Sequence, residues 1–193
     1  MNKKVSNKKT NALGYRGNVT AKILHGNKVV KVQKIHNQGR IGLFRFMSHC
    51  LGNNYFGNEA PRFLRTFKCT EALTNDNLNT QLVMNNETSD IVAFGSIEYG
   101  EGVNEETGNE YASVIYTFLV PSSQINVTQG DAQVNALCLY SLDTFGESSM
   151  NNPIAFVYLD TPLEVSSGSN LVIVWELSIE NIETQESTNE GEE

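Results

Sequence analysis

Short strand-like segments separated by turn-forming clusters recur along most of this chain, and they constrain its fold more than any other feature. Two early segments, residues 19–24 and 29–35, flank a Gly26-Asn27 pair, which is typical of a β-hairpin. The further predicted strands are residues 63–69, 81–84, 91–98, 111–120, 134–140, 154–160 and 170–179. Because no helices alternate with these strands, the pattern predicts a mainly β fold, an antiparallel β-sandwich of jelly-roll-like type with an N-terminal hairpin.

One segment has a helical pattern. Within residues 40–51, Leu43, Phe46, Met47 and Cys50 fall at positions i, i+3, i+4 and i+7, which places them on one face of a helix. An apolar face of this width belongs inside a domain. We therefore expect one α-helix near residues 40–51 that closes one end or one face of the sandwich.

Charge is sorted along the sequence. All fourteen Lys and Arg lie between Lys3 and Lys68 with a single acid, Glu59, so this segment has a net charge of +13. Residues 69–193, 125 in number, hold 21 Asp and Glu and no Lys or Arg. Such asymmetry indicates an oriented, charged interface. A sandwich interleaves early and late strands, however, so the fold can bring part of the two charges together.

The two ends of the chain lack the periodicity of packed segments. We expect residues 1–17 to form a flexible basic arm, residues 18–180 a single β domain, and residues 181–193 a solvated acidic tail. No segment approaches the roughly 18 consecutive apolar residues of a membrane span. No apolar run follows the basic N-terminus, as it would in a secretory signal. We therefore expect no membrane association and a protein that stays in the compartment where it is made.

Residues suited to catalysis or metal binding are sparse. Cys50, Cys69 and Cys138 are odd in number and lack CxxC spacing, which argues against a disulfide framework and a zinc site and favours small buried residues. The three histidines lack paired spacing. His49 and Cys50 are adjacent, but on a helix their side chains point about 100° apart. We expect a protein that is not an enzyme and uses no cofactor and no metal.

Glutamates surround one predicted hairpin loop. They are Glu98, Glu101, Glu105, Glu106 and Glu110. Carboxylates of this kind can bind Ca²⁺, but the loop lacks the ligand register of an EF-hand. A glycosidase pair would depend on a separation in space that the sequence does not give. A solvated acidic loop is the favoured interpretation.

The basic arm supplies the candidate partner-binding residues, Lys3, Lys4, Lys8, Lys9 and Arg16. Phosphates of a nucleic acid would bind such an arm with a steep salt dependence. The arm is short, the whole chain has a net charge of −8, and beyond Tyr15 no aromatic residue is interleaved with the arm for base stacking. An acidic protein partner is therefore favoured over nucleic acid.

Residues 17–23, 35–39 and 43–51 resemble minor structural proteins of tailed phages from gut and other low-GC bacteria. In those proteins a hairpin, a His-Asn-x-Gly turn and a Phe-rich helix ending in Cys-Leu precede a strand-rich body. Residues 125–140 and 171–179 fit the same pattern. The resemblance implies an oligomeric component of the virion, made in the host cytoplasm and attached to the capsid or to the tail. It implies no catalytic residues.

The expected function is that of a structural protein that docks on a phage particle through its basic N-terminal region. The partner would be the major capsid protein or a tail or fibre component, and a capsid auxiliary protein or head-fibre base is favoured. Two other functions remain open. One is a tail or adsorption module that binds receptor glycans through exposed aromatics such as Tyr99, Tyr111 and Tyr158. The other is a genome-binding coat protein.

Overall fold

The computed structural model describes residues 7–39, 61–69, 71–72, 74, 76, 92–93, 95–125, 132–141 and 154–187. Within these residues the chain forms β-strands, their connecting turns and one 3₁₀ helix, η1 (Ser122–Gln124). The α-helix expected at residues 40–51 and the strand expected at residues 81–84 lie outside the described residues. In the part of the chain that is described, no helix has the length and apolar character needed to cross a membrane.

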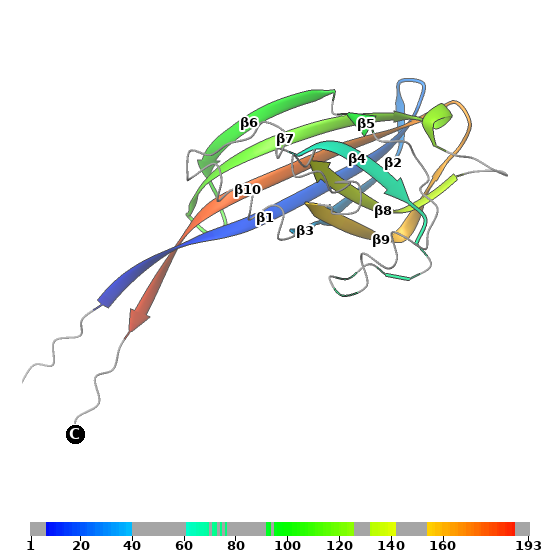
Figure 1. Cartoon of the computed structure of the whole chain (residues 1–193). Helices are drawn as coiled ribbons and strands as arrows, with labels where there is room; N and C mark the ends of the chain where they lie inside the picture. The colour runs from blue at the N-terminus through cyan, green and yellow to red at the C-terminus, as the bar shows by residue number, and fades with distance from the viewer. Residues whose placement is uncertain are drawn as a thin grey trace, which may run out of the picture.

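Sheet A contains five strands in the order β2-β1-β10-β7-β6, each antiparallel to its neighbours (Figure 1). Its strands are β1 (Asn7–His25), β2 (Lys28–His36), β6 (Ser96–Val103), β7 (Glu110–Pro121) and β10 (Ser169–Ser187). The central pair, β1 and β10, is formed by opposite ends of the chain. Their register runs from Asn7 opposite Ser187 to His25 opposite Ser169.

Sheet B also contains five antiparallel strands, in the order β3-β9-β8-β4-β5. They are β3 (Gln38–Gly39), β4 (Pro61–Phe67), β5 (Val92–Ala93), β8 (Ala132–Ser141) and β9 (Ala155–Val165). The prediction of a mainly β fold with antiparallel strands is therefore confirmed as two antiparallel sheets.

The main hydrophobic core draws on both sheets. In β1, Val19, Ala21 and Ile23 are buried, and they alternate with partly exposed residues as the period of a half-buried strand requires. They pack in one cluster with Trp175 of β10, which is fully buried, and with Leu139 of β8. Each large apolar side chain buried in this way contributes about 1.5–3 kcal/mol.

Sheet B is buried on its other face as well. A second cluster contains Phe67 of β4, Cys138 of β8 and Phe156 of β9. Because both faces are covered, residues 134–140 of β8 are all buried, and the sequence there reads as an almost continuous apolar run. Cys69 and Cys138 are buried free thiols, as expected. Cys50 lies outside the described residues.

The expected basic arm is ordered in large part. Residues 7–17, predicted to be flexible, belong to β1, and residues 181–187, predicted to be a solvated tail, belong to β10. The two segments pair with each other, with Lys8 opposite Glu186 and Leu13 opposite Asn181. Backbone pairing satisfies the N–H and C=O groups on the facing edges of the two segments. This explains why a polar sequence without apolar periodicity forms strand here.

The first hairpin follows the prediction. The hairpin of β6 and β7, which carries the cluster of glutamates and is called the acidic hairpin below, differs from it. β1 and β2 are joined at Gly26, whose φ of 58° lies in the left-handed region that glycine favours. Residues 99–109 were expected as a loop, but β6 continues to Val103 and the turn covers only residues 104–109. The pairing of Gly100 and Gly102 with β7 extends the strand.

Candidate functional site

The strand order divides sheet A into a basic half and an acidic half. Strands β2 and β1 contain seven Lys and Arg residues and no acid, whereas β10, β7 and β6 contain seven Glu residues and no base. The basic residues are Lys8, Lys9, Arg16, Lys22, Lys28, Lys31 and Lys34, and the acidic residues are Glu98, Glu101, Glu110, Glu176, Glu180, Glu183 and Glu186. The charge asymmetry of the sequence therefore persists in space, with its boundary between β1 and β10.

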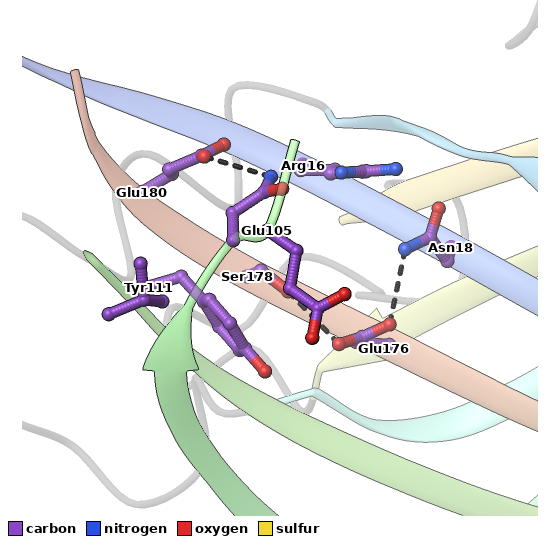
Figure 2. Close-up of a pocket in the computed structure, with 9 residues that line it drawn as sticks. Arg16, Asn18, Glu105, Tyr111, Glu176, Ser178 and Glu180 are labelled. Atoms are coloured by element: carbon purple, nitrogen blue, oxygen red, sulfur yellow. Dashed lines mark hydrogen bonds between the residues drawn. The ribbon is translucent and has the colours of Figure 1, made fainter. Parts of the chain in front are cut away.

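A pocket lies at this boundary. Its volume is about 380 Å³, and its walls come from β1, β10, the start of β7 and the β6–β7 turn. The lining residues are Arg16, Asn18, Val103, Asn104, Glu105, Tyr111, Glu176, Ser178 and Glu180 (Figure 2). Arg16, Asn18, Glu176, Ser178 and Glu180 alternate with core residues along their strands. The pocket is therefore on the face of sheet A that points away from the main core.

Glu176 is held in place by residues of two neighbouring strands. The Asn18 side-chain Nδ2 donates to Oε2 of Glu176 at 3.1 Å, and the Ser178 hydroxyl donates to Oε1 at 3.3 Å. Both carboxylate oxygens thus accept a hydrogen bond. Figure 2 shows the Glu105 side chain extending from the turn toward this carboxylate. The two acids come from segments about 70 residues apart in sequence, so only the sheet pairing brings them together.

Glu180 connects β10 to the acidic turn. Its Oε1 accepts hydrogen bonds from the Thr107 hydroxyl at 2.6 Å and from Asn104 Nδ2 at 3.0 Å. The turn is closed by backbone hydrogen bonds between Asn104 and Asn109 at 2.8 Å and from Gly108 to Asn104 at 2.7 Å. These bonds hold the turn over the end of the pocket.

The pKa of Glu180 lies below its ordinary value of 4.5. The main cause is the hydrogen bond from Thr107, which stabilises the charged carboxylate. Asn104, Asn109 and the positive charge of Arg16 lower it further, while partial desolvation acts in the opposite direction. Glu180 is therefore an anion at neutral pH.

The pocket offers a polar and net negative lining. It contains three carboxylates, one guanidinium group, two amides, one aliphatic hydroxyl and the Tyr111 phenol. Such a set can accept and donate several hydrogen bonds at once, which suits a hydroxyl-rich or cationic group. Within the described residues, no three His, Cys, Asp or Glu side chains are grouped in a way that could hold a metal ion.

The structure separates the residues that the sequence grouped as a binding arm. Arg16 lines the pocket. Lys8 and Lys9 lie in β1, opposite Glu186 and Gln185 of β10. Lys3 and Lys4 lie outside the described residues.

The three candidate glycan-binding tyrosines are also apart. Tyr111 lines the pocket, and Tyr99 is 83% exposed on the edge strand β6. Tyr158 on β9 is partly buried against the second apolar cluster. Asn18, Glu176 and Ser178 were not predicted as site residues from the sequence. The signal was the alternation of Glu176, Ser178 and Glu180 with apolar residues in the closing strand, which predicts a polar outer face.

A buried polar cluster lies on the opposite side of β1, against the core. The Asn37 amide donates from Nδ2 to the Gly17 carbonyl at 2.8 Å. Its Oδ1 accepts from the Tyr15 hydroxyl at 2.8 Å and from Trp175 Nε1 at 2.9 Å. Burial raises the pKa of Tyr15 to about 12. This cluster joins β1, β10 and the end of β2 behind the pocket.

Comparison with protein-family models, curated proteins and solved structures gives no match to this chain.

Proposed function

We propose that this protein is a non-enzymatic structural component of a phage particle and that the paired ends of its chain attach it there. The partner is the major capsid protein or a tail or fibre component, and a capsid position is favoured. We also propose that the strands are connected in a jelly-roll-like way and that residues 40–51 form a helix. Its main support is the paired ribbon formed by β1 and β10.

This ribbon extends beyond the rest of sheet A. The pairing of β2 with β1 ends at Asn18, and the pairing of β7 with β10 ends at Glu180. Residues 7–13 and 181–187 therefore pair with each other and, among the described residues, with no third strand. Figure 1 shows β1 and β10 leaving the body of the molecule side by side.

A ribbon of this kind is suited to docking. Two strands alone are marginally stable in water, so a further strand or surface would stabilise them. Both outer edges present unpaired backbone N–H and C=O groups, which a partner strand can bind. Lys8 and Lys9 lie on one strand and Glu183 and Glu186 on the other, so the two edges differ in charge and define one orientation of the partner.

The proposal is tested with particles purified from the source. A mass-spectrometric inventory should contain the protein, and immunogold labelling should place it on heads or on tails. Its absence from purified particles would overturn the virion assignment. Gold over heads would support the capsid position, and gold at tails would move the protein to the adsorption apparatus.

The role of the ribbon is tested by substitution. Replacing Lys8 and Lys9 with Ser, alone or together with Lys3 and Lys4, should weaken attachment to the particle in moderate salt. The melting temperature of the folded body should change little. A matched double variant, Lys22→Ser with Lys68→Ser, removes the same charge from outside residues 7–13 and 181–187 and should remain attached. Full attachment of the ribbon variant would show that the ribbon is not the docking element.

A second candidate function is recognition of a receptor glycan at the pocket. The observation that favours it is the presence of Tyr111 beside several hydrogen-bonding side chains in one cavity. Glycan-array binding that is lost with Tyr111→Ala and with Glu176→Gln would support it. Tyr99→Ala, an exposed tyrosine outside the pocket, is the matched control. An array without binding by the unaltered protein would argue against this function.

A further inference from the structure

The two edge strands of sheet A carry opposite charges. β2 forms one edge and contains Lys28, Lys31 and Lys34 without an acid. β6 forms the other edge and contains Glu98 and Glu101 without a base. In the part of the chain that the structure describes, neither strand has a second neighbour in the sheet.

Exposed apolar side chains gather on the same two strands. Within the described residues, six large hydrophobic side chains are exposed, and five of them belong to β2 or β6. They are Val29, Val30 and Val32 on β2, and Tyr99 and Val103 on β6. Exposed apolar residues on an open strand edge usually mark a contact surface or lead to aggregation. Natural edge strands are commonly protected by charge. Here each edge carries charge of one sign, which disfavours pairing between two like edges but not pairing of β2 with β6.

The charges decide which pairing is permitted. A two-fold dimer through β2 would place lysines against lysines, and one through β6 would place glutamates against glutamates. Contact between β2 of one copy and β6 of another joins opposite charges and covers part of the exposed apolar surface of both edges. The chain uses the same complementarity internally, where basic β1 pairs with acidic β10.

We propose that copies of this protein associate head to tail, with the basic β2 edge of one copy against the acidic β6 edge of the next. Because all neighbours in sheet A are antiparallel, β2, β10 and β6 run in the same direction. A second copy that continues the sheet with the same face outward therefore brings its β6 alongside β2 in the parallel orientation. This contact is heterologous, so it forms a ring if the rotation between copies closes and a filament if it does not.

Not every lysine of β2 is available to a second copy. Lys31 Nζ donates to the carbonyl of Pro162 at 3.0 Å, and Gln33 Nε2 donates to that of Thr161 at 2.8 Å. These bonds fix β2 to the β9 side of its own molecule. Lys28 and Lys34 are exposed, and Lys34 shares the outer face of the sheet with Val32. Lys34 on β2 and Glu98 on β6 are therefore the residues to test.

The test is sedimentation velocity of the full chain across micromolar to millimolar concentration at low and high salt. The mass of the unaltered protein should rise with concentration and fall with salt. Lys34→Glu and Glu98→Lys should each weaken the association constant roughly tenfold, because an attractive cross-strand pair becomes repulsive. An equimolar mixture of the two variants should associate again, because the unaltered β2 edge of one meets the unaltered β6 edge of the other.

Two matched variants control for charge alone. Lys68→Glu and Glu164→Lys change exposed residues on the sheet B side by the same amount and should associate like the unaltered protein. If Lys34→Glu lowers the melting temperature, Lys28→Glu at the hairpin turn replaces it. A protein that stays monomeric at all concentrations, or edge variants that associate like the controls, would overturn the proposal. The result is independent of where the protein resides, so it can fail while the virion assignment stands, and the reverse also holds.

Discussion

The side-chain amide of Asn37 occupies the position that a β-carbon on residue 17 would need, so Gly17 and Asn37 lie in direct contact between β1 and the end of β2. Both the backbone N–H and the side-chain Nδ2 of Asn37 donate to the Gly17 carbonyl, at 3.0 and 2.8 Å. The contact also holds the Asn37 oxygen against Tyr15 and Trp175. A glycine in the middle of a strand ordinarily weakens it, and here it makes room for a buried hydrogen-bonding group.

Substitution of Gly17 by Ala should therefore destabilise the protein. The added methyl group displaces the Asn37 amide and leaves buried polar groups of Asn37 and Trp175 without partners, at a cost of about 1–3 kcal/mol per group. Chemical denaturation should show the lower free energy of unfolding. Gly95→Ala is the control, because among the described residues a β-carbon there meets only the Thr117 carbonyl, at an ordinary 3.5 Å. Equal stability of the two variants would contradict the role of this contact.

Tyr15 should make the protein sensitive to alkaline pH. Its folded-state pKa of about 12 lies above the ordinary value of 10.0. The corresponding stability is fully present below pH 10 and is lost as the pH rises toward 12, because the unfolded chain releases the proton first. The loss attributable to this group is about 3 kcal/mol. Denaturation of the unaltered protein and of Tyr15→Phe from pH 9 to 12 measures it, and parallel curves for the two proteins would refute the assignment.

Asn135 should be essential for the stability of the segment that follows the end of β4. Its Oδ1 accepts from the Cys69 backbone N–H at 2.6 Å, and its Nδ2 donates to the Cys69 carbonyl at 2.7 Å. The side chain thus pairs with the backbone beyond the last residue of the strand, next to the irregularity between Val134 and Ala136. Asn135→Ala leaves both groups buried and unpaired, at about 1–3 kcal/mol each. Gln133→Ala on the same strand should cost much less, and thermal unfolding of the two variants makes the comparison.

Glu180 should make the stability of the β6–β7 turn depend on pH in the acidic range. Because its folded-state pKa is lowered, its contribution to stability is present above the ordinary value of 4.5 and is lost as the pH falls through the lower folded-state pKa. NMR titration of the carboxyl carbon should give a midpoint below 4.5. Thr107→Val removes the shortest hydrogen bond to Glu180 and should move that midpoint upward, whereas Thr161→Val, on β9, should leave it in place. An unchanged midpoint in Thr107→Val would show that the hydrogen bond is not the main cause.

The parts of the fold that depend on local signals were predictable from the sequence. Gly26-Asn27 gives the first hairpin because glycine accepts the positive φ that the turn needs. The apolar runs of β8 and β9 and the alternation in β7 also match strands in the structure. The acidic hairpin was placed correctly, but its turn is shorter than expected because Gly100 and Gly102 pair rather than turn.

The central pairing of sheet A could not be predicted in the same way. Residues 7–17 carry no apolar period, and the strand that orders them lies more than 150 residues away. The separation of charge along the sequence was a signal for this pairing, since a basic N-terminal segment and an acidic C-terminal segment are complementary. It did not specify which acidic strand pairs with residues 7–17. The pocket has the same origin: Asn18 and Glu176 meet only because β1 and β10 are neighbours. Arg16, one of the five candidate residues of the arm, lies in it.

The pairing of β1 with β10 also fixes when the molecule can be completed during its synthesis on the ribosome. Strand β1 is translated before the other described strands, and β10, which pairs along its whole length, is translated after them. Until β10 emerges, the nascent chain holds Val19, Ala21 and Ile23 without Trp175 to pack against. Contacts of such long sequence separation form slowly, and the partly made chain exposes apolar surface in the meantime. A ribosome stalled before residue 169 should therefore carry a chain that cellular chaperones bind.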